Sequence, residues 1–318
     1  MRIAIVGAGA LGSIYALKLA HVAQVTLVVR DVARAPKRIL AERASGAGPT
    51  SDARDAPPAS LHVPDDADAV LVAVRADQLG DALLASLASG GPPRRVVVTL
   101  TPLLPNTLAR ARAALGERLV VGMPGVVAYE PDAEPALADR HVRYWTPRVS
   151  PTTLDARPAD DPRAQTIGDL AEALVAAGLP AELQPDVART NPATTIAFFP
   201  LLLAIQAAGS SIDALLDDGA LLRLALDAAK ETRALAKTVG ELAGFSRLLL
   251  SFAGTFTVRA GMKLVRARSP EALTFLERHF GTKLASQNRA MLDEIFALAQ
   301  ERGAEIDALT RLAHRAGL

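Results

Sequence analysis

The feature that most constrains the fold is a glycine motif near the start of the chain. Its residues are Gly7, Ala8, Gly9, Ala10, Leu11 and Gly12. They follow an apolar strand pattern and open a helical one. In such a turn the first glycine permits the tight bend, the second lets a pyrophosphate approach the backbone, and the third lets helix and strand pack closely. Free N–H groups and the helix dipole favour phosphate at that helix start. The motif therefore predicts a dinucleotide-binding unit, the alternative being a glycine-rich turn that binds nothing.

The end of the second predicted strand indicates which dinucleotide is bound. Arg30 occupies the position that we count as the strand end, about the distance past the motif where the ribose-reading residue belongs. An arginine there pairs with the 2′-phosphate of NADP, so we expect NADP. If the strand ended one residue later, Asp31 would accept from the 2′-hydroxyl of NAD instead. A solvated charge with no ligand is a further alternative for Arg30.

The first half of the chain alternates short apolar runs with helical patterns, which is typical of a parallel sheet covered by helices. The expected strands are Ile3–Val6, Val25–Val29, Ala69–Val74, Val96–Leu100 and Leu119–Val121. The expected helices are Ala10–Ala20, Asp77–Ala88 and Asn106–Leu115. Ser45–Ser60 is rich in glycine, proline and aspartate, and Pro147–Pro162 in proline and aspartate, so we expect a loop in the first and a loop or linker in the second.

Strand patterns end well before the C-terminus. A strand at Arg140–Trp145, a helix at Thr166–Ala177 and a short strand at Ala181–Gln184 are the last mixed elements that we expect. Helical patterns alone follow Asp186. With 318 residues, the chain has the length of two domains. We predict an α/β fold with a Rossmann-type parallel sheet over residues 1–186, followed by an all-α domain over residues 187–318.

Composition excludes several other classes of protein. Thirty-five Lys and Arg residues balance 34 Asp and Glu residues, which argues against a nucleic-acid partner. The absence of cysteine removes disulfides and thiolate metal sites and fits a cytoplasmic protein. No pair of histidines has the spacing of a zinc site, so we expect no metal. The longest apolar stretch, residues 194–208, is shorter than a membrane span and predicts a buried helix.

Several segments together resemble the ketopantoate reductase family, whose members reduce 2-dehydropantoate with NADPH. They are Ile-Val-Gly-Ala-Gly-Ala-Leu-Gly at residues 5–12, Arg30, Leu71–Gln78, Gly122–Ala128 and Phe199-Pro200-Leu201. The resemblance implies a Rossmann domain joined to a helical domain, with the substrate between them. It also implies cofactor contacts from Arg75, Thr101 and Ala128, where Arg75 replaces a lysine of the family and Thr101 an asparagine.

The same resemblance implies an altered substrate site in the helical domain. The family's general-acid lysine falls on Asn191, and two substrate-binding asparagines fall on Thr195 and Phe199. The family's late glutamate falls on Gln287. Asn191 can donate a hydrogen bond but no proton, and the pocket becomes more apolar than one built for ketopantoate. Ser210 is a further substrate candidate, although Ser210-Ser211 serves equally as a helix N-cap, which we favour.

Lys283 is our candidate for the missing proton donor. His279, Lys283 and Gln287 are spaced four residues apart, so one face of a continuous helix would carry all three, although Gly281 interrupts the stretch. We expect Lys283 to serve as proton donor or carboxylate anchor, the alternative being a solvated surface lysine.

The leading hypothesis is an NADPH-dependent reductase of a 2-oxo acid or related small carbonyl. The alternatives are an authentic ketopantoate reductase of pantothenate biosynthesis and an NADP-binding protein without turnover. A homodimer is one alternative for its assembly.

Overall fold

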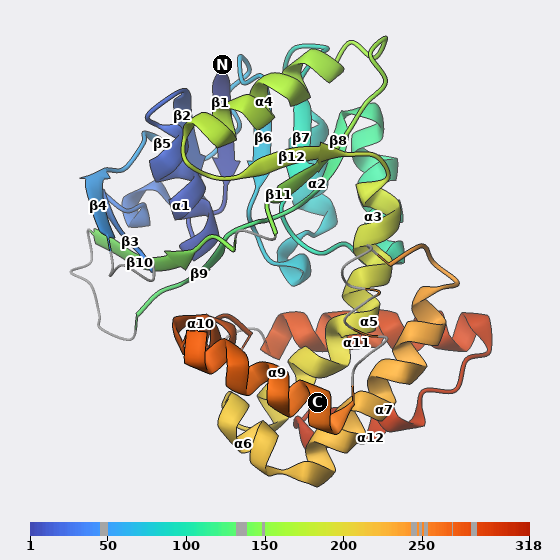
Figure 1. Ribbon diagram of the computed structural model, residues 1–318. Coiled ribbons are helices and arrows are strands. Elements are labelled where there is room, and N and C mark those ends of the chain that lie inside the picture. Colours follow the sequence, from blue (N-terminus) through green and yellow to red (C-terminus); the bar gives the residue numbers. More distant parts are fainter. Residues whose placement is uncertain are drawn as a thin grey trace. The chain divides into compact units, whose positions relative to one another are not determined.

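The computed structural model describes residues 1–44, 50–131, 139–147, 150–242, 247, 250, 254–268, 270–280 and 285–318. The chain divides into two compact units (Figure 1). Unit 1 comprises Met1–Thr101 and Ala109–Ala188, and unit 2 comprises Pro102–Leu108 and Arg189–Leu318. Unit 2 therefore includes a short segment from the first half of the chain.

Unit 1 is built on an eight-stranded sheet with the order β12-β11-β8-β7-β6-β1-β2-β5. The strands are β1 (Arg2–Val6), β2 (Gln24–Val28), β5 (Ala59–Ser60), β6 (Ala69–Val72), β7 (Val96–Thr99), β8 (Leu119–Met123), β11 (Thr152–Asp155) and β12 (Ala181–Gln184). The six strands from β8 to β5 are parallel, whereas β11 pairs with β8 in antiparallel register. The four strands β1, β6, β7 and β8 are buried along most of their length, because helices cover the sheet.

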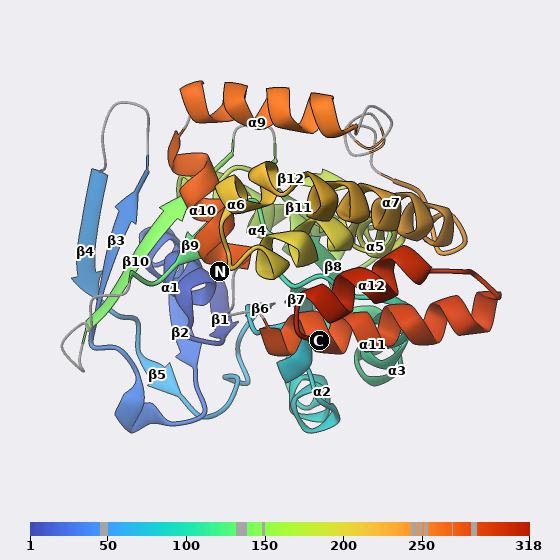
Figure 2. The same ribbon diagram turned by 90° about the horizontal axis from the view of Figure 1, so that it is seen from below.

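A second, four-stranded sheet in unit 1 has the order β4-β3-β10-β9, and Figure 2 shows β4, β3 and β10 side by side. Its strands are β3 (Arg38–Arg43), β4 (Thr50–Asp55), β9 (Val127–Tyr129) and β10 (Asp139–Trp145). The expectation of a loop over Ser45–Ser60 is wrong, because β4 and β5 lie within it. Most of β4 is exposed and polar, so only its pairing with β3 makes it a strand.

The segment Pro147–Pro162 is also not wholly a loop, because it contains β11. Thr152 and Leu154 of this strand are buried against β8 and the core. The expected helices before residue 186 are present as α1 (Ala10–Leu19), α2 (Asp81–Ala88), α3 (Pro105–Leu115), whose first turn belongs to unit 2, and α4 (Ala164–Ala176). Helix α2 starts later than expected, because a separate 3-10 turn covers Ala76–Gln78.

Helix α1 packs between the two sheets of unit 1. It contacts β1 and β2 of the large sheet, and β3, β9 and β10 of the small one. Seven of its ten residues are buried, and Tyr15 and Ile14 are fully enclosed. The helix that follows the glycine motif is thus a central element of the unit, which holds its position tightly.

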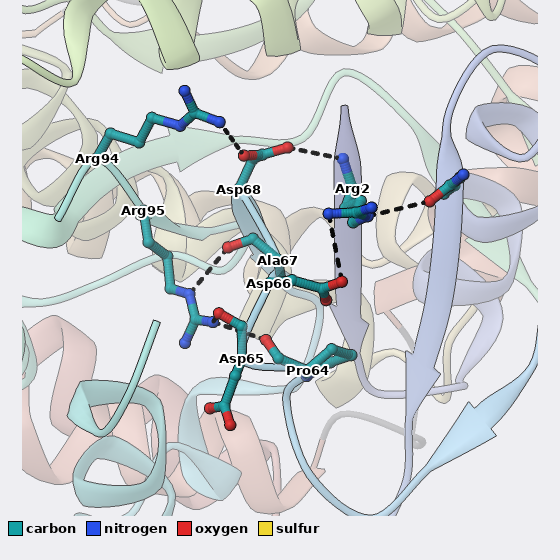
Figure 3. Close-up of polar contacts among 9 residues, drawn as sticks. Arg2, Pro64, Asp65, Asp66, Ala67, Asp68, Arg94 and Arg95 are labelled. Carbon is teal, nitrogen blue, oxygen red and sulfur yellow. Dashed lines mark hydrogen bonds and ion pairs between the residues drawn. The ribbon is translucent and has the colours of Figure 1, made fainter. Parts of the chain in front are cut away.

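A buried arginine closes the opposite, amino end of the parallel strands (Figure 3). The Arg95 side chain is 1% exposed, and its guanidinium donates to the carbonyl oxygens of Pro64, Asp65 and Ala67 at 2.6, 2.9 and 3.0 Å. Its neighbour Arg94 is exposed and holds the Asp68 carboxylate at 3.0 Å. Arg95 therefore joins the start of β7 to the segment that leads into β6.

The described part of unit 2 after residue 188 is helical. Its helices are α5 (Val187–Ala207), which begins at the end of unit 1, α6 (Ile212–Asp217), α7 (Gly219–Ala236), α9 (Thr255–Arg268), α10 (Pro270–Phe280), α11 (Ala285–Arg302) and α12 (Asp307–Arg315). The core of unit 2 gathers apolar residues of α5, α6, α7, α10, α11 and α12, and Leu104 joins them. Among the described residues, no helix combines the length and apolarity that a bilayer span requires.

Candidate cofactor site

The turn from β1 to α1 has the geometry that its glycines predict. Gly7 has a φ of +102°, and a Cβ there would stand 3.0 Å from the carbonyl oxygen of Ala73 and from Val74 Cγ1. Its N–H donates to the carbonyl of Val28 on β2 at 3.0 Å. A side chain at this position would be both strained and crowded, so the turn requires glycine.

The other two glycines differ in what surrounds them. A Cβ on Gly12 would lie 1.9 Å from the carbonyl oxygen of Gly7, so only glycine lets α1 approach the turn this closely. A Cβ on Gly9 would meet no atom within 4 Å. Gly9 is also the N-cap of α1 and makes no side-chain cap, which leaves the helix start for an external acceptor. Space at Gly9 and free helix N–H groups suit a pyrophosphate.

The residues after β2 separate the two candidates for the ribose position. Asp31 accepts a hydrogen bond from the N–H of Ala33 at 2.9 Å and caps the 3-10 turn Val32–Arg34. Arg30 is exposed, and its side chain forms no ion pair within the described ranges. Because the Asp31 carboxylate has a local role in the backbone, Arg30 is the better placed of the two to meet a ligand.

The carboxyl edge of the sheet holds Arg75 and Thr101. Arg75 follows β6 and forms a two-pronged ion pair with Asp77, with N–O distances of 3.0 and 3.1 Å. The hydrogen bonds that Arg75 donates to Asp77 raise the pKa of Arg75 above its ordinary value. Thr101 follows β7 and is buried. Parallel strands end at one edge, so both residues stand on the side of the sheet where the glycine turn lies.

The third candidate of this unit, Ala128, lies at the centre of β9. It pairs with Tyr144 of β10 in the smaller sheet and is buried. The structure thus places Ala128 in the four-stranded sheet, rather than in the large sheet that carries the glycine turn.

In unit 2, Asn191 and Thr195 are brought together on α5. The Thr195 hydroxyl donates to the side-chain oxygen of Asn191 at 3.1 Å, and both side chains are buried. Phe199, one turn further along, is fully enclosed in the core of unit 2. The three residues that we predicted for the substrate site therefore form a buried polar pair followed by a core residue.

The remaining substrate and catalytic candidates are spread over other parts of unit 2. Ser210 has a φ of +65° before α6, and the helix N-cap is its neighbour Ser211, which accepts from the N–H of Ala214 at 3.2 Å. Gln287 is buried near the start of α11. Lys283 lies outside the described residues, as does the side chain of His279, so their shared helix face stays a prediction.

One buried polar pair in unit 1, Tyr15 and Thr152, was not predicted from the sequence. The Tyr15 hydroxyl on α1 contacts Thr152 Oγ1 at 2.7 Å, and the N–H of Gly125 donates to the same Oγ1 at 3.0 Å. Tyr15 and Thr152 are 137 residues apart, and neither stands in a motif. Local pattern carries no signal for such a pair, because its partners meet only in the folded chain.

These features define a class of protein. The strand order runs outward in both directions from the boundary between β1 and β6, which is the switch point at which open α/β sheets bind ligands. The glycine turn with open space at Gly9 follows β1 at that point. Unit 1 is a Rossmann-type domain, and a helical unit follows it.

Comparison with known proteins places the chain more narrowly. Residues 3–124 match the family model ApbA, described as ketopantoate reductase PanE/ApbA. Over these residues the chain is similar to this family. Among curated proteins, none matches the chain in sequence.

Solved structures of the same fold cover nearly the whole chain. A 2-dehydropantoate 2-reductase from Geobacter metallireducens is 17% identical with a TM-score of 0.66, over 100% of this chain and 99% of its own. A dimeric ketopantoate reductase from Staphylococcus aureus is 12% identical, with a TM-score of 0.66 and coverages of 99% and 97%. A D-mandelate dehydrogenase, with NADH and anilino(oxo)acetate, is 15% identical, with a TM-score of 0.66 and coverages of 100% and 97%. At these identities the likeness concerns the fold.

Proposed function

We propose that the protein is an NADPH-dependent reductase that transfers a hydride to a 2-oxo acid or a related small carbonyl. The observation that carries the proposal is the glycine cradle, in which Gly7 and Gly12 have no room for a side chain while Gly9 faces open space. That combination fits a pyrophosphate on the backbone, since a merely structural turn has no need of the free space.

Each residue of the cradle has a distinct part in this proposal. The N–H groups at the start of α1 hold the pyrophosphate, and Arg30 holds the 2′-phosphate that distinguishes NADP from NAD. Asp77 orients the Arg75 guanidinium at the same edge of the sheet. The bound nicotinamide supplies the hydride.

The carbonyl oxygen needs a hydrogen-bond donor as negative charge develops on it. Asn191 offers an amide for this role, and Lys283 remains our proposed proton donor. Thr195 orients the Asn191 amide through its hydroxyl, because the amide oxygen accepts from Thr195 and the amide nitrogen is thereby directed away from it. Gln287 and Ser210 complete the proposed substrate side, whereas Phe199 is enclosed in the core of unit 2.

A pair of glycine substitutions tests the cradle. Gly9 has a φ of −75°, which alanine adopts without strain, and its Cβ would touch no protein atom. We expect Gly9→Ala to fold with unchanged thermal stability and to bind NADPH at least tenfold more weakly, measured by fluorescence titration. Gly12→Ala is the contrasting variant. Its methyl group would overlap the Gly7 carbonyl, so it should lose both stability and affinity.

Two outcomes would refute the cofactor proposal. One is an unmodified protein that shows no saturable binding of NADPH, and the other is a Gly9→Ala variant that binds as the parent does. Arg30→Ala tests the choice of cofactor. It should weaken NADPH by roughly tenfold, the equivalent of one charge-assisted hydrogen bond, and leave NADH unchanged. An equal loss for both would assign Arg30 no role at the 2′-phosphate.

The substrate is tested by NADPH oxidation with ketopantoate and with a panel of other 2-oxo acids. Turnover of ketopantoate as the best substrate would assign the chain to pantothenate biosynthesis. Turnover of another 2-oxo acid as the best substrate would assign the chain a different reaction within the proposed class. Tight NADPH binding without oxidation of any panel member would favour a binding protein without turnover. The observation behind this alternative is that Asn191 and Gln287 carry amides, which cannot supply a proton.

We also propose that the protein is cytoplasmic and forms a homodimer. A dimeric neighbour of the same fold and the absence of cysteine support these two points. Sedimentation of the purified chain measures the assembly directly, and a monomer at micromolar concentration would contradict it.

A further inference from the structure

The strongest unassigned feature of unit 1 is the buried contact between Tyr15 and Thr152. Tyr15 lies on α1, has no exposed surface, and its hydroxyl is 2.7 Å from Thr152 Oγ1. Thr152 is the first residue of β11 and is fully buried as well. Burial raises the pKa of Tyr15, so its phenol stays protonated. Two neutral hydroxyl groups thus join α1 to β11, the strand that is antiparallel to β8.

The same two hydroxyl groups hold the turn that leaves β8. The N–H of Gly125 donates to Thr152 Oγ1 at 3.0 Å and also interacts with the Tyr15 hydroxyl. A Cβ on Gly125 would stand 2.2 Å from the Thr152 nitrogen and 2.3 Å from the carbonyl carbon of Pro151. The turn therefore lies flat on the chain before β11, and it has no room to shift toward that strand.

The place of this turn in the sheet gives the contact its significance. β8 is parallel to β7 and β11 is antiparallel to β8, so Met123 and Pro124 stand at the carboxyl edge. A dinucleotide whose pyrophosphate lies on the turn after β1 reaches along this edge in both directions from the switch point. In the proposed function, one half would lie over β2 and carry the ribose that Arg30 reads. The other half, the nicotinamide, would lie over β6, β7 and β8.

We propose that the Tyr15–Thr152 hydroxyl pair is a positioning element for the nicotinamide half of the cofactor. It sets the distance between α1, which holds the phosphates, and the turn Met123–Gly125, which borders the nicotinamide. Neither hydroxyl touches the cofactor, because both are enclosed. Met123 and Pro124, which are partly exposed, form the surface that the pair places. This inference rests on the proposed function.

If the hydroxyl pair positions the nicotinamide half, its loss should weaken only a ligand that carries the nicotinamide ring. If the pair only stabilises the fold, its loss should affect ligands with and without that ring equally. NADPH and 2′-phospho-ADP-ribose share the adenine, the phosphates and both riboses, and differ in the nicotinamide ring. We expect Thr152→Val to weaken NADPH by about fivefold to tenfold, the equivalent of one net hydrogen bond. The affinity for 2′-phospho-ADP-ribose should stay within twofold of the parent, since the cradle at Gly9 is unchanged.

Variants with graded chemistry complete the test. Thr152→Ser keeps the oxygen and should restore NADPH affinity, whereas Tyr15→Phe keeps the ring and should lose affinity in the same selective way. Thr232→Val is the matched control. Thr232 is equally buried on α7 and its hydroxyl donates to the Ala228 carbonyl, so its loss costs stability and should leave both affinities unchanged. Hydrogen exchange of the Gly125 amide, without ligand, should be faster in Thr152→Val.

The outcomes separate this inference from the proposed function. Equal losses for NADPH and 2′-phospho-ADP-ribose, or parental NADPH affinity in Thr152→Val, would overturn the positioning role while leaving the cofactor proposal intact. A parent protein that binds neither ligand would overturn both. If Thr152→Val does not fold, Tyr15→Phe and Thr152→Ser decide the question by the same comparison of ligands.

Discussion

Replacing Arg95 with methionine should destabilise unit 1 by far more than replacing its neighbour. The Arg95 guanidinium donates to three carbonyl oxygens at short range, 2.6 Å to Pro64, 2.9 Å to Asp65 and 3.0 Å to Ala67 (Figure 3), and to that of Ser89 at 3.5 Å. The Ala67 carbonyl belongs to a buried residue, and those of Pro64 and Asp65 are partly accessible. Methionine fills a similar volume and offers no donor, so the expected loss arises mainly from hydrogen bonding.

The magnitude follows from the accessibility of each carbonyl. A buried acceptor without a donor costs about 1–3 kcal/mol, and the two partly accessible carbonyls recover part of their loss from water. Burial removes water from the guanidinium and thereby lowers the pKa of Arg95. Replacing the guanidinium removes this desolvation cost, which offsets part of the loss. We therefore expect Arg95→Met to lose roughly 2–4 kcal/mol, which corresponds to a fall in Tm of about 5–12 °C for a unit of this size.

The assay is thermal and urea unfolding, with Arg94→Met as the matched control. Arg94 is adjacent in sequence, its side chain is 66% exposed, and it makes one ion pair, with Asp68. Such an exposed pair contributes about 0–1 kcal/mol. If Arg95→Met were no less stable than Arg94→Met within about 1 kcal/mol, the three carbonyl contacts would have no net energetic value and the reasoning would be refuted.

Two further predictions concern the same unit. Gly91→Ala should be destabilised by roughly 1–3 kcal/mol in urea unfolding, because Gly91 has a φ of +81° and its Cβ would lie 1.9 Å from Arg95 Cζ; parental stability would show that the Arg95 side chain can move freely. Glu42 bonds to Arg143 at 2.7 Å, which lowers the pKa of Glu42. Its contribution to the free energy of unfolding should be present near neutral pH and lost as pH falls below about 4.5. Glu42→Gln should therefore reduce the dependence of that free energy on pH in the acid range, and an unchanged dependence would contradict the prediction.

The local pattern of the sequence determined the elements around the glycine turn. Residues 3–12 contain an apolar run, three spaced glycines and the start of a helix, so the strand, the turn and the helix all follow from neighbouring residues. The apolar runs of β6, β7 and β8 were equally visible, because each is buried on both faces and needs no other segment to be recognised. The long helices after Asp186 follow from their periodic pattern for the same reason.

Only the tertiary structure decided the features that depend on distant partners. β4 is a polar, exposed segment that is a strand because β3 pairs with it, and β11 is a strand because β8 does. The partners of Arg95 are carbonyl groups, which carry no sequence signature. Tyr15 and Thr152 are ordinary residues until the fold places their hydroxyl groups 2.7 Å apart. The sequence by itself determined the glycine turn between β1 and α1, because that turn is one continuous segment. The structure decided how the rest of the carboxyl edge is held, because backbone pairing and burial join segments that lie far apart in the chain.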